Sequence, residues 1–199
     1  SEMCIRDRGM IPKDWEIKSL DEIAIYLNGL ALQKYPPKGD SSDIPIIKIA
    51  QLRKGKSDES DKCSNDIAEE YVIRDGDILF SWSGSLLVDL WTGGWGALNQ
   101  HLFKVTSDAY KKWFIFYWTE YHLQEFQRSA KSKATTMGHI QRKHLSEAKI
   151  LLPPGNLMEK FNPIFDPLLE KQINVRLESK FLSQLRDTIL PKLISGELR

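Results

Sequence analysis

The sequence has few cysteines, no long apolar run and almost no net charge. Its two cysteines, Cys4 and Cys63, lie far apart and form no CxxC pair, so neither a disulfide framework nor a zinc cluster is indicated. No apolar run approaches the roughly 20 residues that span a bilayer, and no basic stretch followed by an apolar core precedes Met10. We therefore expect a soluble, unexported protein of the reducing cytoplasm, with no membrane partner.

The charge balance and the length limit what the chain can be. Lys and Arg total 28 and Asp and Glu total 27, which leaves a net charge of +1 over 199 residues. Such a balance exerts no overall attraction on nucleic acid or membranes, so any site for a polyanion must be local. The length and the 41% hydrophobic content suffice for one folded domain with an appendage, but not for two domains of typical size.

The motifs of common enzymes are also missing. Ser83 and Ser85 are not part of a GxSxG elbow, and no GxGxxG cofactor loop is present. The stretch NPIF at 162–165 matches only part of the Asn/Asp-Pro-Pro-aromatic motif of methyltransferases. His139 and His144 lie five residues apart, not four, and no carboxylate motif accompanies them. We therefore expect no catalytic site, no cofactor and no metal site.

One pair of residues keeps an enzymatic alternative open. Glu147 and Lys149 form the Glu-x-Lys half of the motif of many magnesium-dependent nucleases, in which the carboxylate holds the metal and the lysine steadies the attacking water. The upstream aspartate that such a site requires is not evident, because Asp75 and Asp77 lie far away in the sequence. Chance occurrence of the pair in a charged chain is the simpler explanation.

The first part of the chain is rich in expected strands. Residues 1–9 are charged and lack periodicity, so we expect them to be a tag or sequence scar outside a domain that begins at Met10. Residues 20–27 fit either a short helix or a strand, and 53–65 reads as a polar loop. Short apolar runs bounded by turn residues predict strands at 44–52, 77–82, 98–105 and 148–152.

A helix of about five turns is predicted at 109–128, because aromatic residues recur there at helical spacing without Gly or Pro. We expect this helix to bury Trp113, Phe116 and Tyr117, with Tyr121 as a further candidate. A cofactor-binding aromatic box is the alternative, but a stripe at this spacing is more often part of a core.

After the Pro-Pro-Gly boundary at 153–155 the periodicity becomes helical. Pro163 and Pro167 are expected to confine the regular helix to the stretch after residue 166, or to kink it. Lys171 and Glu178 interrupt the facing positions, so the seam is not uniform. A single helix cannot bury such a seam, so we expect a partner helix from a second copy or another chain. The apolar residues that recur every seven positions, on one seam of this helix, are Phe161, Leu168, Val175, Leu182 and Ile189.

A stretch without Asp or Glu, at 127–146, is the main candidate for binding a polyanion. It combines Lys and Arg, which neutralise phosphates, with Gln, Arg and His, which reach base edges in the major groove of DNA. A solvated basic loop at 129–146 is the alternative, and convergence with two other polar segments would favour DNA. The candidate DNA-binding residues of the basic stretch are Lys133, Thr135, Thr136, His139, Gln141, Arg142, Lys143 and His144. The other two segments add Arg53, Lys54, Ser81, Ser83 and Ser85.

Five stretches resemble the type I restriction-modification DNA specificity subunits, and they follow one another in that family's order after Met10. Their succession, more than any one of them, carries the resemblance. The five stretches are IPKDWEIKSLDEIA, GDILFSWSGS, LNQHLFKV, ATTMGHIQRKHLSEAKILLPP and LSQLRDTILPKLISGELR.

The resemblance implies a mixed α/β fold with a DNA target-recognition domain at 10–154 and a conserved helical spacer and dimerisation region at 155–199. It implies a non-catalytic subunit that reads one half of a bipartite target in double-stranded DNA. Such a subunit recruits the methyltransferase subunit, with the restriction subunit as an open further partner.

The sequence departs from the family in having one such unit, where members carry two in tandem with antiparallel spacer helices. Either the chain is a half-subunit that pairs with itself or with another half, or it is a piece of a longer gene. A small magnesium-dependent nuclease and a helical protein-interaction adaptor remain the alternative functions.

Overall fold

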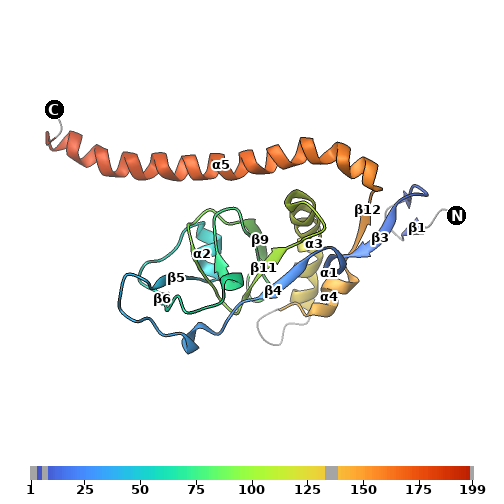
Figure 1. Cartoon of the computed structure of the whole chain (residues 1–199), viewed down its shortest axis with the longest axis horizontal. Helices are drawn as coiled ribbons and strands as arrows, with labels where there is room; N and C mark the ends of the chain where they lie inside the picture. Colours follow the sequence, from blue (N-terminus) through green and yellow to red (C-terminus); the bar gives the residue numbers. More distant parts are fainter. Residues whose placement is uncertain (1–3, 6–8, 133–138, 198–199) are drawn as a thin grey trace.

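The structure, a computed structural model, describes residues 4–5, 9–132 and 139–197. Figure 1 shows a mixed α/β domain below one long helix, α5 (Gly155–Ile194), which lies across the top of the domain. The 40 residues of α5 span about 60 Å at about 1.5 Å per residue. The expected mixed α/β fold with a long C-terminal helix is confirmed.

The larger core is built on an antiparallel sheet whose strands run in the order β4-β11-β8-β9. Every residue of β8 is buried, because this strand lies between two hydrophobic clusters. Phe80 belongs to one cluster and Leu79 to the other, as the alternation of side chains along a strand requires. The strands are β4 (Ile25–Asn28), β8 (Ile78–Ser81), β9 (Leu87–Leu90) and β11 (Leu102–Thr106).

The second cluster joins this sheet to a smaller one of order β6-β5-β10-β7. Strands β5 and β10 pair in parallel, and the other pairs are antiparallel. Gly96 lies so close to β5 that a Cβ there would be 2.7 Å from the carbonyl oxygen of Pro45, so this position requires glycine. The strands are β5 (Ile44–Ile47), β6 (Lys62–Cys63), β7 (Val72–Ile73) and β10 (Gly96–Leu98).

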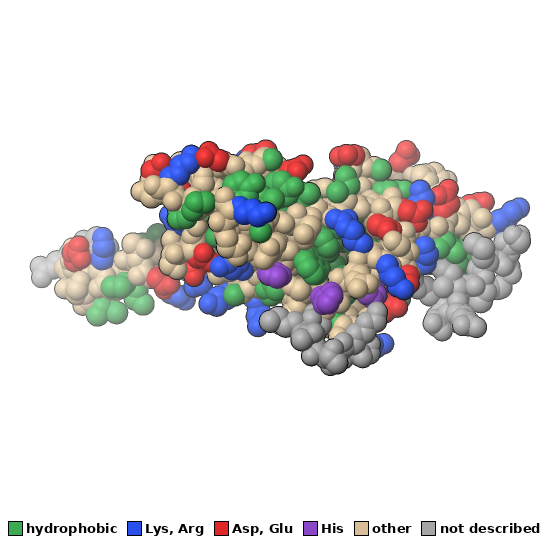
Figure 2. Space-filling view, turned by 90° about the horizontal axis from the view of Figure 1, so that it is seen from below, with side chains coloured by type: hydrophobic (Ala, Val, Ile, Leu, Met, Phe, Trp, Pro, Cys, Tyr) green, Lys and Arg blue, Asp and Glu red, His purple; other side chains and the backbone are tan. Residues whose placement is uncertain are grey.

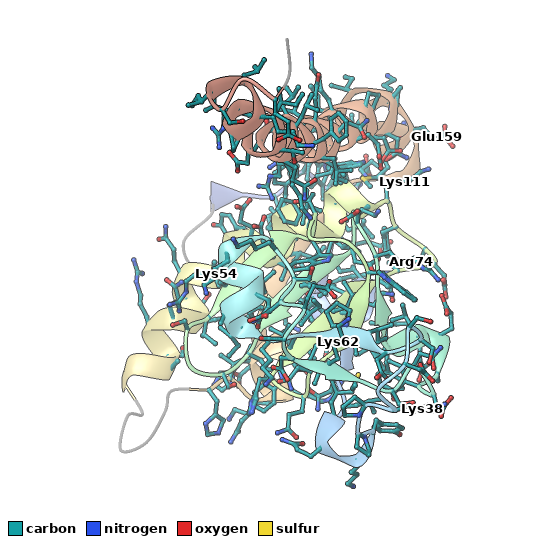
Figure 3. All side chains as sticks on the ribbon, turned by 90° about the vertical axis from the view of Figure 1, so that its left-hand side faces the viewer. Lys38, Lys54, Lys62, Arg74, Lys111 and Glu159 are labelled. Carbon is teal, nitrogen blue, oxygen red and sulfur yellow. The ribbon has the colours of Figure 1, made fainter. Side chains whose placement is uncertain are left out.

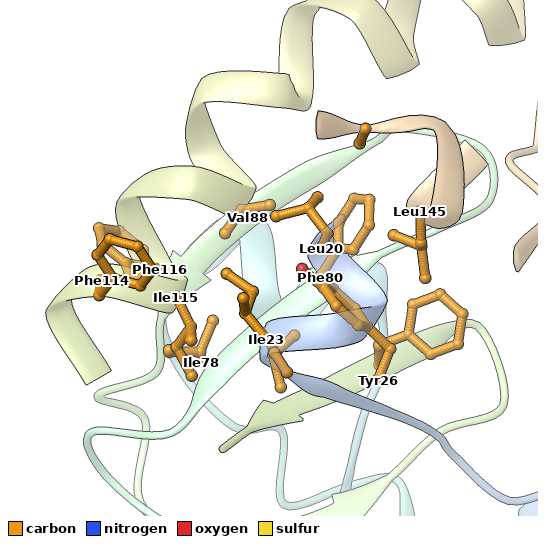
Figure 4. Close-up of a cluster of buried hydrophobic side chains, with 14 of the residues drawn as sticks. Leu20, Ile23, Tyr26, Ile78, Phe80, Val88, Phe114, Ile115, Phe116 and Leu145 are labelled. Carbon is orange, nitrogen blue, oxygen red and sulfur yellow. The ribbon is translucent and has the colours of Figure 1, made fainter. Parts of the chain in front are cut away.

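A layer of helices and one β-ribbon packs on the other face of the larger sheet. Figure 4 shows Ile115 against Ile78 of the sheet, and Leu20 and Leu145 in the same cluster. Strands β3 and β12 pair antiparallel, which brings the start of the domain beside the segment that leads into α5. The elements of this layer are α1 (Leu20–Ile23), α3 (Lys112–Ser132), α4 (Arg142–Glu147), β3 (Glu16–Ser19) and β12 (Lys149–Leu152).

The strand expected at 44–52 is shorter than the sequence indicated. It ends at Ile47, and helix α2 (Ile49–Lys54) follows. The N–H of Lys48 donates to the side-chain Oε1 of Gln51 at 3.3 Å, which satisfies a donor at the helix start. The loop expected at 53–65 accordingly includes the end of α2 and strand β6.

The strand expected at 98–105 is divided between the two sheets. Leu98 is the last residue of β10 and residues 102–105 belong to β11, because the chain leaves one sheet and enters the other at this point. A turn in which the N–H of Leu102 donates to the carbonyl of Asn99 at 2.9 Å makes the crossing. The strands expected at 77–82 and 148–152 are confirmed as β8 and β12.

Several shorter segments complete the domain. Residues 20–27, for which a helix and a strand were both open, form α1 and then the first part of β4. In the N-terminal segment expected to be a tag or scar, β1 and β2 make a two-residue antiparallel pairing. The short elements are β1 (Cys4–Ile5), β2 (Gly9–Met10) and the 3-10 helices η1 (Leu32–Lys34) and η2 (Glu69–Tyr71).

The predicted aromatic helix is confirmed as α3, but part of its expected buried face is wrong. Trp113 and Phe116 are buried, whereas Tyr117 is 41% exposed and Tyr121 is 59% exposed. The buried stripe of α3 is centred on Ile115 and its successors at helical spacing, and the two tyrosines lie on the opposite side of the helix.

Of the two expectations for the early prolines, confinement of the helix to the stretch after residue 166 is wrong, and a kink was the alternative. Helix α5 begins at Gly155, with Pro163 and Pro167 inside it. Residues of α5 before and after these prolines pack on the domain, and this packing stabilises the helix there. The Trp113 ring stacks on Phe165 with centroids 4.7 Å apart, and Met158 and Leu169 are buried. This packing offsets the backbone hydrogen bond that each proline removes.

Two cations attach α5 to the larger sheet farther along the helix. The Arg176 guanidinium lies 2.6 Å from the Asp89 carboxylate and 3.2 Å from the carbonyl oxygen of Leu90. The ammonium of Lys180 donates to the carbonyl of Thr92 at 3.3 Å. Among the described helices, none is both long enough and apolar enough to cross a membrane.

Substitution of two adjacent leucines of α5 would test which side of the helix packs on the domain. Leu169 is 1% exposed and Leu168 is 56% exposed. We expect Leu169→Ala to lower the free energy of unfolding by about 2–5 kcal/mol, because it leaves a cavity between helix and domain. The matched variant Leu168→Ala should change it by about 0.5 kcal/mol or less in the isolated chain. Urea denaturation measures both, and equal effects would contradict this packing.

Candidate nucleic-acid interface

Three segments that are distant in sequence meet where β8 ends. Trp82 follows β8, and its Nε1–H donates to Asn28 Oδ1 of β4 at 2.9 Å. The N–H of Ile140 donates to the carbonyl of Trp82 at 3.0 Å, and Ser83 pairs with His139 in an isolated antiparallel bridge. The polar segment after β8 and the start of the α4 segment therefore converge on one surface, as the DNA-binding hypothesis requires.

The turn between β10 and β11 supplies the third segment. His101 is exposed, and its Nδ1 lies 3.1 Å from Ser83 Oγ. Its ring centroid is 6.0 Å from that of Trp82, and Gln100 Nε2 is 3.4 Å from its Nε2. His101 and Gln100 were not among the residues expected at the site. The signal for them in the sequence was two polar residues within an expected strand.

A pocket of about 350 Å³ opens between these segments. Its wall combines aromatic rings with amide, imidazole and guanidinium groups. The lining residues are Asn28, Trp82, Phe103, His139, Ile140, Gln141 and Arg142.

Arg142 is held at the wall of this pocket. Its Nη2 donates to the backbone carbonyl of Tyr26 at 3.3 Å, and its guanidinium lies 5.8 Å from the centroid of the Phe103 ring. Burial raises the pKa of the Tyr26 hydroxyl, which hydrogen-bonds Thr119 at 2.7 Å. The Tyr26 side chain therefore stays neutral. A guanidinium has five N–H donors, so one hydrogen bond leaves others for a ligand.

Helix α4 is anchored from below. Leu145 is buried in the larger core, and Ser146 Oγ donates a hydrogen bond to Asp21 at the start of α1. Burial opposes ionisation of Asp21, but hydrogen bonds from Ser146 and Ser19 outweigh it and lower the pKa of this carboxyl. The anchoring keeps the first turn of α4 at the surface, where Gln141, Arg142 and Lys143 are exposed.

This surface lies on the face of the molecule turned away from α5. Figure 2, seen from that side, shows histidine side chains among Lys and Arg side chains. Helix α2 borders the same region, since a Cβ at Gly84 would be 3.8 Å from the Ile49 side chain. Arg53 and Lys54 are exposed in the last turn of α2.

Two of the expected DNA-binding side chains are not at the surface. Ser81 is 0% exposed, and its hydroxyl hydrogen-bonds the carbonyls of Ser83 at 3.1 Å and Ser85 at 2.8 Å. His144 is 9% exposed, and its Nδ1 accepts the N–H of Gln141 at 2.8 Å. Both are corrected to structural roles, because they shape the local backbone. Arg142, Lys143 and His144 also lie on helix α4 and not on a loop.

Three further expected residues, Lys133, Thr135 and Thr136, lie outside the described residues. The Glu-x-Lys pair is split between two elements: Glu147 ends α4 and lies 3.6 Å from Lys143, and Lys149 begins β12. Within the described part of the chain, no three His, Cys, Asp or Glu side chains are grouped as a metal site would require.

Comparison with known proteins decides the family. A family model described as the type I restriction modification DNA specificity domain matches residues 12–179. The chain belongs to this family. The match covers the candidate site, both sheets and most of α5.

The chain is similar in sequence to specificity subunits from two microorganisms. The specificity subunit of type I restriction enzyme MjaIX from Methanocaldococcus jannaschii is 31% identical over 199 residues, covering 95% of this chain and 45% of the relative. The EcoBI specificity subunit from Escherichia coli is 25% identical, covering 94% of this chain and 40% of the relative. The chain thus spans less than half the length of these relatives.

Solved structures show the same fold. The type I restriction-modification S subunit from M. genitalium has a TM-score of 0.59 at 16% identity, covering 96% of this chain and 48% of that one. The HsdS subunit from Thermoanaerobacter tengcongensis has a TM-score of 0.56 at 18% identity, covering 98% and 48%. The specificity-domain chain therefore shares its fold with about half of each of these subunits.

Proposed function

We propose that this chain is a non-catalytic DNA-recognition subunit that reads one half of a bipartite target. The observation that carries the proposal is the convergence of three polar segments on the face opposite α5. The loop after β8, the turn at 99–101 and the first turn of α4 bring amide, imidazole and guanidinium groups together there. These groups are the ones that hydrogen-bond base edges and phosphates.

The exposed side chains have distinct roles in this proposal. Gln141, Arg142 and His139 border the pocket and contact base edges, and Lys143 contacts a phosphate. Arg53 and Lys54 at the end of α2 extend the phosphate contacts to one side. Ser83 and Ser85 line the loop beside His101. Lys133, Thr135 and Thr136 keep their assignment from the sequence.

The proposed domain boundary follows from the same division of the molecule. Residues 10–154 form the target-recognition domain and 155–199 the helical spacer. The spacer separates two reading domains and recruits the methyltransferase subunit, and in a complete system the restriction subunit. The DNA contacts and the helix lie on opposite faces, so a protein partner on α5 leaves the DNA-binding face open.

The spacer is also proposed to pair with a second copy of the chain or with another half-subunit. Leu168, Val175 and Leu182 of the predicted seam are each about half exposed, at 56%, 49% and 54%. Phe161 differs, because it already packs partly against the larger core, and Ile189 is partly exposed. A row of exposed leucine and valine on one helix is stabilised when a second helix covers it.

The first test compares two arginines. Arg142→Ala should weaken binding to the target DNA by about 1–3 kcal/mol, or about 5- to 150-fold, because it removes a guanidinium from the reading surface. Figure 3 shows Arg74 on the other side of the domain from Lys54, so Arg74→Ala is the matched control and should leave the affinity unchanged. Fluorescence anisotropy at one fixed salt concentration measures both. Equal affinities of the two variants would refute the assignment of Arg142.

The second test identifies the target. The chain is co-expressed with its methyltransferase subunit in a host without DNA methylation, and modified adenines are mapped by direct sequencing. Two identical reading domains related by a two-fold axis should give a split motif with inverted half-sites. An asymmetric motif would show that a different second half completes the subunit. Absence of methylation by an assembled complex would contradict the recognition function.

The third test concerns the seam. Leu182→Asp should convert the paired chain to a monomer, because pairing would bury a carboxylate without a partner. Gln184→Asp is the matched control, since Gln184 is exposed on the other side of the same helix. Light scattering gives the mass of each variant. A dimer that survives Leu182→Asp would show that the seam is placed wrongly.

A further inference from the structure

An apolar groove lies between α3 and the first turns of α5, on the side of the molecule away from the DNA-binding residues. Its volume is about 360 Å³. Tyr117 and Tyr121 of α3 form one wall, and Phe161 and Phe165 of α5 form the other, with Trp15 at one end. The two tyrosines are 41% and 59% exposed, so the groove presents aromatic surface to solvent. Clustered exposed aromatic side chains mark interaction sites on soluble proteins.

The far end of α5 has the opposite character. From Phe181 to residue 197, every side chain of the described chain except Ile189 is exposed. This part of the helix lies beyond Lys180, whose ammonium hydrogen-bonds the carbonyl of Thr92. The large apolar side chains exposed there are Phe181, Leu182, Leu185, Leu190, Leu193 and Ile194.

The charges beside the seam favour one orientation of a second α5. Lys171 and Glu178 flank Val175, the middle residue of the seam, at nearly equal distances along the helix. In an antiparallel pair centred on Val175, Lys171 of each copy comes beside Glu178 of the partner subunit. In a parallel pair in register, like charges would meet instead. Opposite charges attract and like charges repel across such a seam, so antiparallel pairing is favoured.

This register places the helix end at the groove. Phe161 lies about 21 Å before Val175 along α5, and Leu193 lies about 27 Å after it, at about 1.5 Å per residue. The partner's Leu193 therefore passes Phe161 by about one helical turn. Phe161 belongs to both the seam and the groove, so a helix lying along the seam continues into the groove.

We propose that the groove binds the last turns of α5 from a second copy of this chain, with Leu190 and Leu193 of the partner subunit against Tyr117 and Tyr121. The proposal rests on the pairing proposed above and adds a contact from the recognition domain itself. Because each domain then contacts its partner's helix, the orientation of the two DNA-reading surfaces depends on the groove as well as on the helix pair.

Disulfide cross-linking tests the contact. The chain carrying Cys4→Ser, Tyr121→Cys and Leu193→Cys should form a covalent dimer under mild oxidation. A bond within one chain is excluded, since Leu193 lies about 48 Å along the helix from the groove residue Phe161. Cys63 can stay, because it is 0% exposed and burial raises the pKa of its thiol to about 11.

A matched variant controls for random collision. Lys34→Cys, which places the thiol at an exposed site on η1, combined with Leu193→Cys should remain uncross-linked. As an independent measurement, Tyr121→Asp should raise the dissociation constant of the dimer by about tenfold or more, because a carboxylate is poorly accommodated in an apolar groove. Tyr121→Phe should leave it nearly unchanged.

The outcomes separate this contact from the pairing and from DNA recognition. Cross-linking through Tyr121→Cys but not through Lys34→Cys supports the contact. A dimer in solution that is not cross-linked through Tyr121→Cys, and whose dissociation constant Tyr121→Asp leaves unchanged, overturns it and leaves the helix pairing standing. A monomeric chain overturns both. DNA affinity, measured on the same variants, shows separately whether the recognition surface works.

Discussion

Burial of β8 on both faces is the constraint on which the rest of the structure depends. Its side chains alternate between two hydrophobic clusters, so the strand fixes the distance between the two sheets and the position of α3. Its last residue, Ser81, is fully buried and bonds the carbonyls of Ser83 and Ser85. The loop after β8 therefore starts from a strand that is buried along its whole length, and the Ser81 hydroxyl holds the backbone of that loop. In the proposed function, this packing holds the polar groups of the surface in place before DNA binds.

Helix α3 packs between the larger sheet and the start of α5. Its buried stripe packs on the larger sheet, and its exposed tyrosines line the groove beside α5. The cations Arg176 and Lys180 attach α5 to the sheet from which the loop after β8 also starts. The position of α5 relative to that loop is thus set by packing within one domain. In the proposed function, this packing fixes the distance between the DNA-binding surface and the helix.

Much of the fold was predictable because its signals are local. The helix at α3, the strands β8 and β12 and the helical character of α5 follow from periodicity over neighbouring residues. The ends of the elements were harder to predict. The expected strand at 98–105 is interrupted after Leu98, where the chain passes from one sheet to the other, and the periodicity of the stretch does not indicate this crossing. The two prolines of α5 misled the prediction of its start, since the aromatic packing that stabilises the first turns comes from Trp113 on another helix.

The sequence by itself determined the helical character of α3 and α5, the strands β8 and β12 and which segment is basic, because these properties depend on residues close together in the chain. Only the tertiary structure decided which of those residues face solvent. Ser81 and His144 turn inward, Arg142 lies over Phe103 at a pocket, and His101 joins the site although no local pattern assigned it there. Tyr117 and Tyr121 turn outward for the same reason. The exposure of a side chain depends on what distant segments pack against it, and that information lies in no window of the sequence.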